Sequence, residues 1–179
     1  MPATPPETSV VEHEVRVAAR PETVFSYFTD PTKMIRWIGA EATLDPRPGG
    51  VCRIAFRPSE ARVELVRTAF GAREEKPAGS SETRAILGEF VDVDPYRRIA
   101  FTWGWEQELF AVPPASTTVE VSFSQDRGET VVRLAHRRLP PDAVEFHRAG
   151  WEHYLGRLAL AAGGGDPGPD PWAANEDQT

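Results

Sequence analysis

The sequence predicts an α+β fold in which a curved antiparallel sheet of about seven strands wraps around a long C-terminal helix. Three observations lead to this prediction. Residues 139–165 have the apolar period of a helix, alternating apolar residues mark the strands before it, and hairpin-type turns join most of these strands. Strands with short connections pair antiparallel. A sheet of this length curls, so one amphipathic helix is able to cover its concave face.

The C-terminal helix has the strongest signal. Its apolar and aromatic side chains recur at spacings of three and four, which places them on one face. They are Val144, His147, Trp151, Tyr154, Leu155, Leu158 and Ala162. Asp142 is expected to be the N-cap, with Glu145 completing a capping box, and the glycine run 163–165 ends the helix.

Two glycines inside this helix need an explanation. Gly150 and Gly156 each cost about 1 kcal/mol relative to alanine. We therefore expect a close approach by another backbone or by a bulky group. The buried face also mixes imidazole, indole and phenol rings with aliphatic side chains. Two interpretations stay open, ordinary core packing with polar tips at the rim and a ligand space between helix and sheet.

The N-terminal part begins with a Pro- and Thr-rich segment, residues 1–9, which we expect to be disordered. Residues 11–17 alternate between apolar and charged side chains, as a half-buried strand does. Pro21 opens a short helix, because its missing N–H does no harm there, and a second short helix covers about residues 31–37.

The middle of the chain reads as β-structure. Strands at 41–44 and 51–56 flank the turn sequence at 47–50. Residues 57–82 are predicted to form an elaborated hairpin, with a strand near 63–66 and a polar loop at 74–81.

The remaining strands lead to the helix. They are expected at 83–93, at 98–105, where Ile99, Phe101, Trp103 and Trp105 share a face, at 117–124 and at 129–137. The last two flank a hairpin turn at 126–128. Residues 164–179 are rich in glycine, proline and acidic side chains and are predicted to be a disordered tail.

Composition excludes some classes of function. The net charge of −7 gives no electrostatic support for nucleic-acid or membrane binding. Cys52 is the single cysteine, so there is no internal disulfide and a reducing cytoplasm is expected. No signal peptide or membrane-spanning stretch is found. We expect a cytoplasmic protein with one ordered domain at residues 10–163.

Five stretches together resemble a known family. They are ARPETVFSYFTDPTKMIRWIG, RPGG, VDVDPYRRIAFTWGWE, STTVEVSFSQDRGETVVRLAHRRL and HRAGWEHYLGRLA. Over residues 10–163 they look like the START-like SRPBCC superfamily, which has the fold of the birch-pollen allergen. The most similar branch is that of the activator of the heat-shock-protein-ninety ATPase. The resemblance implies a helix-grip fold, often around a deep apolar pocket. The chaperone-binding N-terminal domain of the activator has no counterpart in these residues, which disfavours a co-chaperone role.

Catalytic and metal-binding motifs are not found, and no catalytic residue, metal or cofactor is assigned. The expected site is a cavity whose flat walls are aromatic and whose polar contacts are Arg53 and His136. The predicted ligand-binding residues are Arg53, Phe101, Trp103, Trp105, His136, His147, Trp151, Tyr154 and Leu155. Cys52 is expected to be a buried, inert thiol.

Three interpretations of function remain. The first is a protein that binds a hydrophobic or polycyclic small molecule, with a role in secondary metabolism or antibiotic self-resistance as in some members of the superfamily. The second is a co-chaperone-like module in the stress response that binds a chaperone or another protein. The third is an aromatase- or cyclase-like enzyme acting on a polyketide-type substrate. For the third, only His136, His147 and Tyr154 offer an acid or base, so the sequence leans away from an enzyme.

Overall fold

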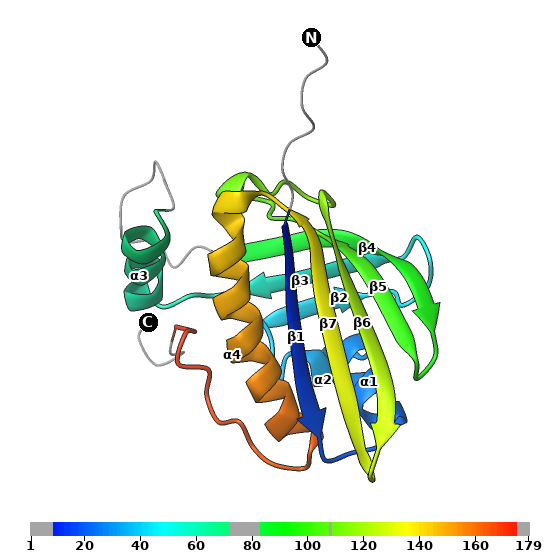
Figure 1. Cartoon of the computed structure of the whole chain (residues 1–179). Helices are drawn as coiled ribbons and strands as arrows, with labels where there is room; N and C mark the ends of the chain where they lie inside the picture. The colour runs from blue at the N-terminus through cyan, green and yellow to red at the C-terminus, as the bar shows by residue number, and fades with distance from the viewer. Residues whose placement is uncertain (1–8, 72–82, 108, 175–179) are drawn as a thin grey trace.

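The computed structural model describes residues 9–71, 83–107 and 109–174, in which a seven-stranded antiparallel sheet curves around one long helix (Figure 1). The strands are β1 (Ser9–Val17), β2 (Glu41–Leu44), β3 (Val51–Phe56), β4 (Arg84–Asp94), β5 (Arg98–Trp103), β6 (Thr117–Asp126) and β7 (Glu129–Leu139). Their order is β1-β7-β6-β5-β4-β3-β2, so the first strand pairs with the last. The predicted α+β, helix-grip fold is confirmed.

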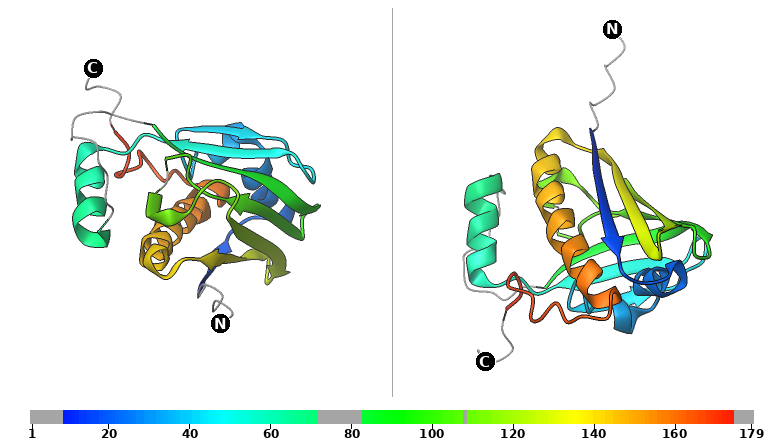
Figure 2. Two further views of the ribbon diagram at one scale, coloured as in Figure 1. Left: turned by 90° about the horizontal axis from the view of Figure 1, so that it is seen from above. Right: turned by 60° about the horizontal axis from the view of Figure 1, so that its bottom comes forward.

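In the described ranges, four α-helices accompany the sheet. They are α1 (Pro21–Thr29), α2 (Pro31–Met34), α3 (Glu60–Phe70) and α4 (Val144–Ala162), with single 3-10 turns η1 (Leu109–Ala111) and η2 (Pro141–Ala143). Helices α1 and α2 close one end of the sheet, α4 lies along its concave side, and α3 stands beside α4 (Figures 1 and 2). Among the described residues, no helix is long and apolar enough to cross a membrane.

Helix α4 packs onto the sheet through the face that its periodicity predicts. Trp151, Leu155 and Leu158 are almost completely buried. Burial of each such side chain stabilises the fold by roughly 1.5–3 kcal/mol. The predicted capping box is wrong, because Asp142 lies within the turn η2 and Ala143 takes the N-cap position without a side-chain bond.

The β6–β7 hairpin supplies a rigid part of the sheet. Its turn residues Arg127 and Gly128 have φ angles of 54° and 80°, as a two-residue hairpin turn with the right twist requires. The strands then pair without a register shift from Asp126–Glu129 to Thr118–Arg137. This fixed register holds buried polar side chains of both strands opposite α4.

The prediction for residues 57–82 is wrong, because α3 occupies most of the described part. The Ser59 hydroxyl accepts a hydrogen bond from the Arg62 backbone N–H at 3.2 Å, and Gly71 ends the helix with a φ of 65°. A hairpin partner for β3 would need a free edge of that strand, but β3 already pairs with both β2 and β4. Residues 72–82 lie outside the described residues.

Residues 164–174, which the sequence predicts to be part of a disordered tail, pack against α4 in the structure. The Arg157 guanidinium donates to the carbonyl oxygens of Pro167 and Gly168 at 3.3 and 2.9 Å. The Trp172 indole stacks on the His153 ring with centroids 3.7 Å apart. Side chains of α4 therefore hold a segment whose own composition is typical of disorder. Residues 1–8 and 175–179 lie outside the described residues.

Deletion of residues 166–179 should destabilise the domain, since it removes the Trp172 stack and the carbonyl partners of Arg157. We expect a loss of about 2 kcal/mol, which lowers Tm by roughly 4–8 °C for a domain of this size. Calorimetry on the shortened protein measures this, with deletion of 175–179 alone as the control. Equal melting of both shortened proteins and the full chain would contradict the structural role of the segment.

Candidate functional site

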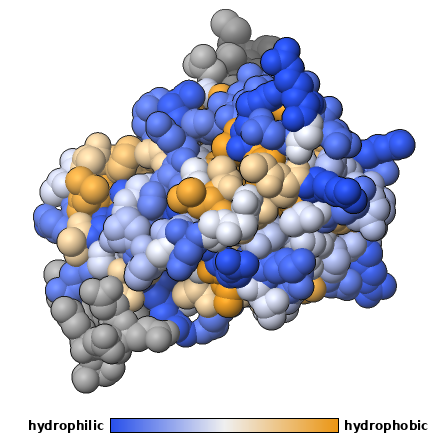
Figure 3. Space-filling view, turned by 90° about the horizontal axis from the view of Figure 1, so that it is seen from below, coloured by the Kyte–Doolittle hydropathy of each residue, from blue (hydrophilic) through white to orange (hydrophobic). Residues whose placement is uncertain are grey.

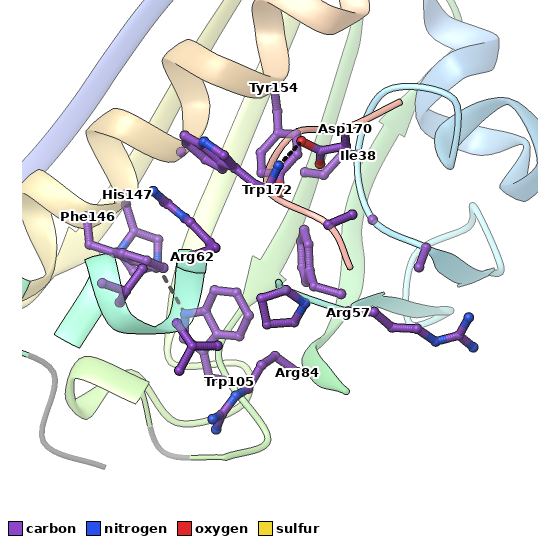
Figure 4. Close-up of a pocket in the computed structure, with 18 of the residues that line it drawn as sticks. Ile38, Arg57, Arg62, Arg84, Trp105, Phe146, His147, Tyr154, Asp170 and Trp172 are labelled. Carbon is purple, nitrogen blue, oxygen red and sulfur yellow. Dashed lines mark hydrogen bonds between the residues drawn. The ribbon is translucent and has the colours of Figure 1, made fainter. Parts of the chain in front are cut away.

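A cavity of about 140 Å³ lies between the sheet, α4, α3 and the C-terminal segment, and it is partly open to solvent (Figure 4). Its walls are formed by Phe56, Trp103 and Trp105 from the sheet side and by Phe146, His147, Gly150, Trp151 and Tyr154 from α4. Its roof, meaning the side formed by α3 and the C-terminal segment, contributes Arg62, Val63, Val66, Asp170 and Trp172. The site is therefore an aromatic pocket with charged groups at its mouth.

The structure brings together most, but not all, of the predicted site residues. Those that line the cavity are Trp103, Trp105, His147, Trp151 and Tyr154. Phe101, His136 and Leu155 are buried in the core and do not line it. Arg53 is the error. It alternates with buried Cys52 and Ile54, so its side chain leaves β3 on the other face and forms a two-bond ion pair with Glu106 at 2.8 and 3.1 Å.

Gly150 leaves space rather than accepting a close neighbour. A Cβ atom added to Gly150 would meet no atom within 4 Å, and the same holds for Gly156. The predicted close approach of a backbone or bulky group is therefore absent at both positions. Gly150 lies between Phe146 and Tyr154 in one row of the helix, and all three line the cavity. The missing side chain of Gly150 is thus part of the open volume, whereas Gly156 lies on the exposed side of α4.

His136 joins α4 to the sheet through a chain of buried hydrogen bonds. The Trp151 Nε1–H donates to His136 Nδ1 at 3.1 Å. The Thr117 hydroxyl donates to the Trp103 carbonyl at 2.8 Å, so at the 2.8 Å contact with His136 Nε2 it is the imidazole that donates. Both ring nitrogens are thereby used, and burial lowers the pKa of His136 well below its usual value of 6.5, with His147 adding to the effect.

His147 has the opposite tautomer. Its Nδ1–H donates to the Ala143 carbonyl at 2.7 Å, and its Nε2 accepts the indole N–H of Trp105 at 3.2 Å. Burial lowers the pKa of His147 to about 4. The imidazole is neutral near pH 7. A proton on Nε2 would leave the Trp105 N–H without an acceptor.

Burial also keeps the Tyr154 phenol and the Cys52 thiol in their uncharged forms. Burial raises the pKa of the Tyr154 phenol, and the nearby Asp170 carboxylate adds to this. Burial raises the pKa of the Cys52 thiol to about 12, as expected for an inert cysteine. Within the described ranges, no three His, Cys, Asp or Glu side chains are grouped closely enough to hold a metal ion.

Comparison with known proteins assigns the family. The family of Activator of Hsp90 ATPase homolog 1-like proteins matches residues 18–163. The chain belongs to this family. It is 36% identical to an AHSA1-like protein from Rhizobium etli, whose structure was solved in solution. The match covers 95% of this chain and 91% of that one, with a TM-score of 0.62.

More distant relatives share the fold. DynU16, a protein of the dynemicin biosynthetic locus, is 21% identical, with a TM-score of 0.66 over 91% of this chain and 50% of that protein. CalU16 from Micromonospora echinospora is 19% identical, with a TM-score of 0.57 over 89% of this chain and 87% of that one. The activator of 90 kDa heat shock protein ATPase homolog 1 from Mus musculus is 32% identical over 72 residues, which is 38% of this chain and only 20% of the mouse protein.

The predicted site residues include none of the roof and leave out the wall residues Phe56, Phe146 and Gly150. Phe56 lies two residues after Ile54 and four after Cys52 on β3, so the strand pattern alone was enough to place it on the same inner face. Ser59 and Gly71 carry helix-end signals for α3 that the prediction of a hairpin overlooked. Trp172 has no local signal, because its place depends on contacts with His153 and Arg62, far away in the chain.

The buried histidines predict loss of stability in acid. A His whose pKa is about 4 when folded and about 6.5 when unfolded stabilises the fold fully above pH 6.5, and this stabilisation is lost as the pH falls toward 4. His147 alone should lower the free energy of unfolding by about 2 kcal/mol between pH 7 and pH 5. Urea unfolding at the two pH values measures this loss. A His147→Gln variant should lose clearly less stability than the wild type does. Equal acid sensitivity of the variant and the wild type would show that His147 is not the titrating group.

Proposed function

We propose that this protein binds a flat, hydrophobic small molecule in the cavity between the sheet and α4. The observation that carries the proposal is an aromatic cavity kept open at Gly150, where a side chain would otherwise fill the space. Aromatic walls with few polar groups are typical of sites for planar apolar ligands. The glycine lowers helix stability and gains no packing contact, which fits a position kept free for a ligand.

The size of the cavity limits the ligand. A volume of about 140 Å³ is close to that of an engineered apolar cavity that stays dry and binds benzene. The enclosed part therefore takes about one aromatic ring. The rest of a larger polycyclic ligand would lie in the mouth, below α3 and the C-terminal segment. A ligand with two or three fused or linked rings fits this arrangement.

The chemistry of the cavity favours binding over catalysis. A general acid or base needs a pKa near the working pH and a free position toward the substrate. His136 and His147 use both ring nitrogens in hydrogen bonds, and the pKa of each is lowered by burial. The raised pKa of Tyr154 keeps its phenol protonated. We therefore favour a carrier or sequestering protein over a cyclase. The place of DynU16 in the dynemicin biosynthetic locus supports a link of this kind of protein to secondary metabolism.

A chaperone-binding function is the second candidate, favoured by the match to the mouse ATPase activator. The exposed face of the sheet carries ion pairs, among them Arg133–Glu14 and Arg137–Glu120, both 2.8 Å long. The face seen from below carries hydrophobic patches at its centre and over α3, bordered by hydrophilic residues (Figure 3). A chaperone ATPase assay with and without this protein tests that candidate directly.

The neutral bicyclic compound 2-naphthamide should bind and quench tryptophan fluorescence, because Trp103, Trp105 and Trp151 line the cavity. We expect a Kd of roughly tens of micromolar. This corresponds to a favourable binding free energy of about 0.5 kcal/mol per non-hydrogen atom of the ligand. Gly150→Leu should fill the cavity and weaken binding at least about tenfold. The same change should leave the fold intact or stabilise it by up to about 0.8 kcal/mol, since leucine is a better helix former than glycine.

Gly156→Leu is the matched control. It makes the same change in the same helix on the exposed side, where an added side chain also meets no neighbour. It should raise helix stability in the same way and leave the Kd unchanged. Absence of saturable binding in the wild type, or equal binding by both variants, would argue against the cavity as a ligand site.

A further inference from the structure

We infer that the ligand is an organic acid whose flat apolar part lies in the cavity and whose anionic group is bound by Arg62 at the mouth. This inference rests on the proposed function and adds the ligand's charge and orientation. It starts from the charges around the cavity. Arg57, Arg62, Arg67 and Arg84 line it, against the single carboxylate of Asp170. Such an excess of positive charge is unexpected in a chain with a net charge of −7.

Several of these charged groups already have partners within the protein. Arg57 forms an ion pair with Glu41, and its side chain points away from the cavity in Figure 4. Arg67 pairs with Glu64 one turn earlier in α3, at 2.7 Å. Asp170 contacts His153 Nε2 at 2.9 Å and accepts the backbone N–H of Trp172 at 3.0 Å. The Arg84 guanidinium lies farther along the rim, in the view of Figure 4.

Arg62 differs from these arginines. Its side chain reaches from α3 toward α4, beside Trp172 (Figure 4). Its guanidinium carbon lies 3.5 Å from the centroid of the Trp172 ring. In the part of the chain that the structure describes, the guanidinium forms no ion pair and donates no hydrogen bond. Burial lowers the pKa of Arg62, although Tyr154 and Asp170 oppose this effect. A half-buried cation without a bonded anion is costly, and an anionic ligand would remove that cost.

The stack around Arg62 orients its guanidinium before any ligand binds. Trp172 lies between the Arg62 guanidinium on one face and the His153 imidazole, which stacks on it with ring centroids 3.7 Å apart. The backbone on both sides of Trp172 is also tied to the start of α3. Ser59 N–H donates to the Trp172 carbonyl at 2.9 Å, and Ala174 N–H donates to the Arg57 carbonyl at 2.8 Å. Because one flat face of the guanidinium rests on the indole, the N–H groups along its edge stay available to a planar acceptor. A carboxylate accepts two parallel bonds from such an edge.

The position of Arg62 also agrees with the size of the cavity. The enclosed part takes about one ring, so the other end of a larger ligand must lie at the mouth, where Arg62 is placed. The deep walls are aromatic, and the nitrogens of His147 and Trp105 there bond each other at 3.2 Å. Among the described residues, the buried Trp103 Nε1–H has no partner, so these walls offer an acceptor one neutral donor but no cation. The acid is therefore expected to face outward, and the ring to face Trp103 and Trp151.

The test compares 2-naphthoate with 2-naphthamide, which have the same ring system and nearly the same shape but differ in charge. The wild-type protein should bind 2-naphthoate about tenfold more tightly than the amide, and the preference should shrink at high salt. Arg62→Gln should weaken the binding of 2-naphthoate about tenfold and change the Kd of 2-naphthamide less than twofold. Arg62→Lys, which keeps the charge and loses the paired N–H edge, should restore part of the preference.

Arg67→Gln is the control, because it removes a positive charge from the same helix and the same rim where Glu64 already neutralises it. It should leave both affinities within twofold of the wild type. Equal binding of acid and amide by the wild type, or a loss of both probes to the same extent in Arg62→Gln, would overturn the inference and leave the proposed function standing. Failure of both probes to bind the wild type would remove the proposed function and this inference together.

Discussion

The arrangement of the site depends on the hydrogen bonds that connect α4 to the sheet through two buried imidazoles. One chain runs from Trp151 through His136 and Thr117 to the Trp103 carbonyl, and the other from Trp105 through His147 to the Ala143 carbonyl. Buried polar groups are costly when they lack a partner, so these bonds fix the rotation and height of α4 over the sheet. The indoles of Trp151 and Trp105 are thereby held at set positions, and the space between them cannot close by a small shift of the helix. The cavity is thus a consequence of polar bonding as much as of ring shape.

The walls and the roof of the cavity differ in how firmly they are held. The walls stand on a continuous sheet and on α4, whose inner face is almost completely buried. Helix α3 has no buried residue, and the C-terminal segment is attached mainly by Arg157, His153 and the start of α3. Elements with few buried apolar contacts open at lower free energy than the core does. A ligand would therefore reach the rings by displacement of the roof, while the walls keep their shape.

The fold was predictable from the sequence because its signals are local and repeated. The period of α4, the alternation in the strands and the turn at 126–128 each specify their element without reference to distant residues. The aromatic walls followed from the same patterns. The roof was not predictable in this way, since Trp172 and Arg62 meet only when segments far apart in the chain come together. The position of Arg53, in contrast, could be predicted from the strand pattern alone. Arg53 lies between Cys52 and Ile54 on β3, so its side chain points to the opposite face, whereas Phe56 shares the inner face with them.

The charge at the mouth has a consequence for how ligand and roof act on each other. Arg62 belongs to α3, and Trp172, which covers it, belongs to the C-terminal segment. An anion bound at Arg62 would add a partner to the contact between the Arg62 guanidinium and the Trp172 ring. By thermodynamic linkage, a closed roof raises the affinity for the ligand, and the bound ligand stabilises the closed roof by the same free energy. A neutral ligand that fills only the ring space lacks this contact. Selectivity for an acid would thus arise from closure of the roof, even in a protein whose net charge of −7 opposes the approach of anions.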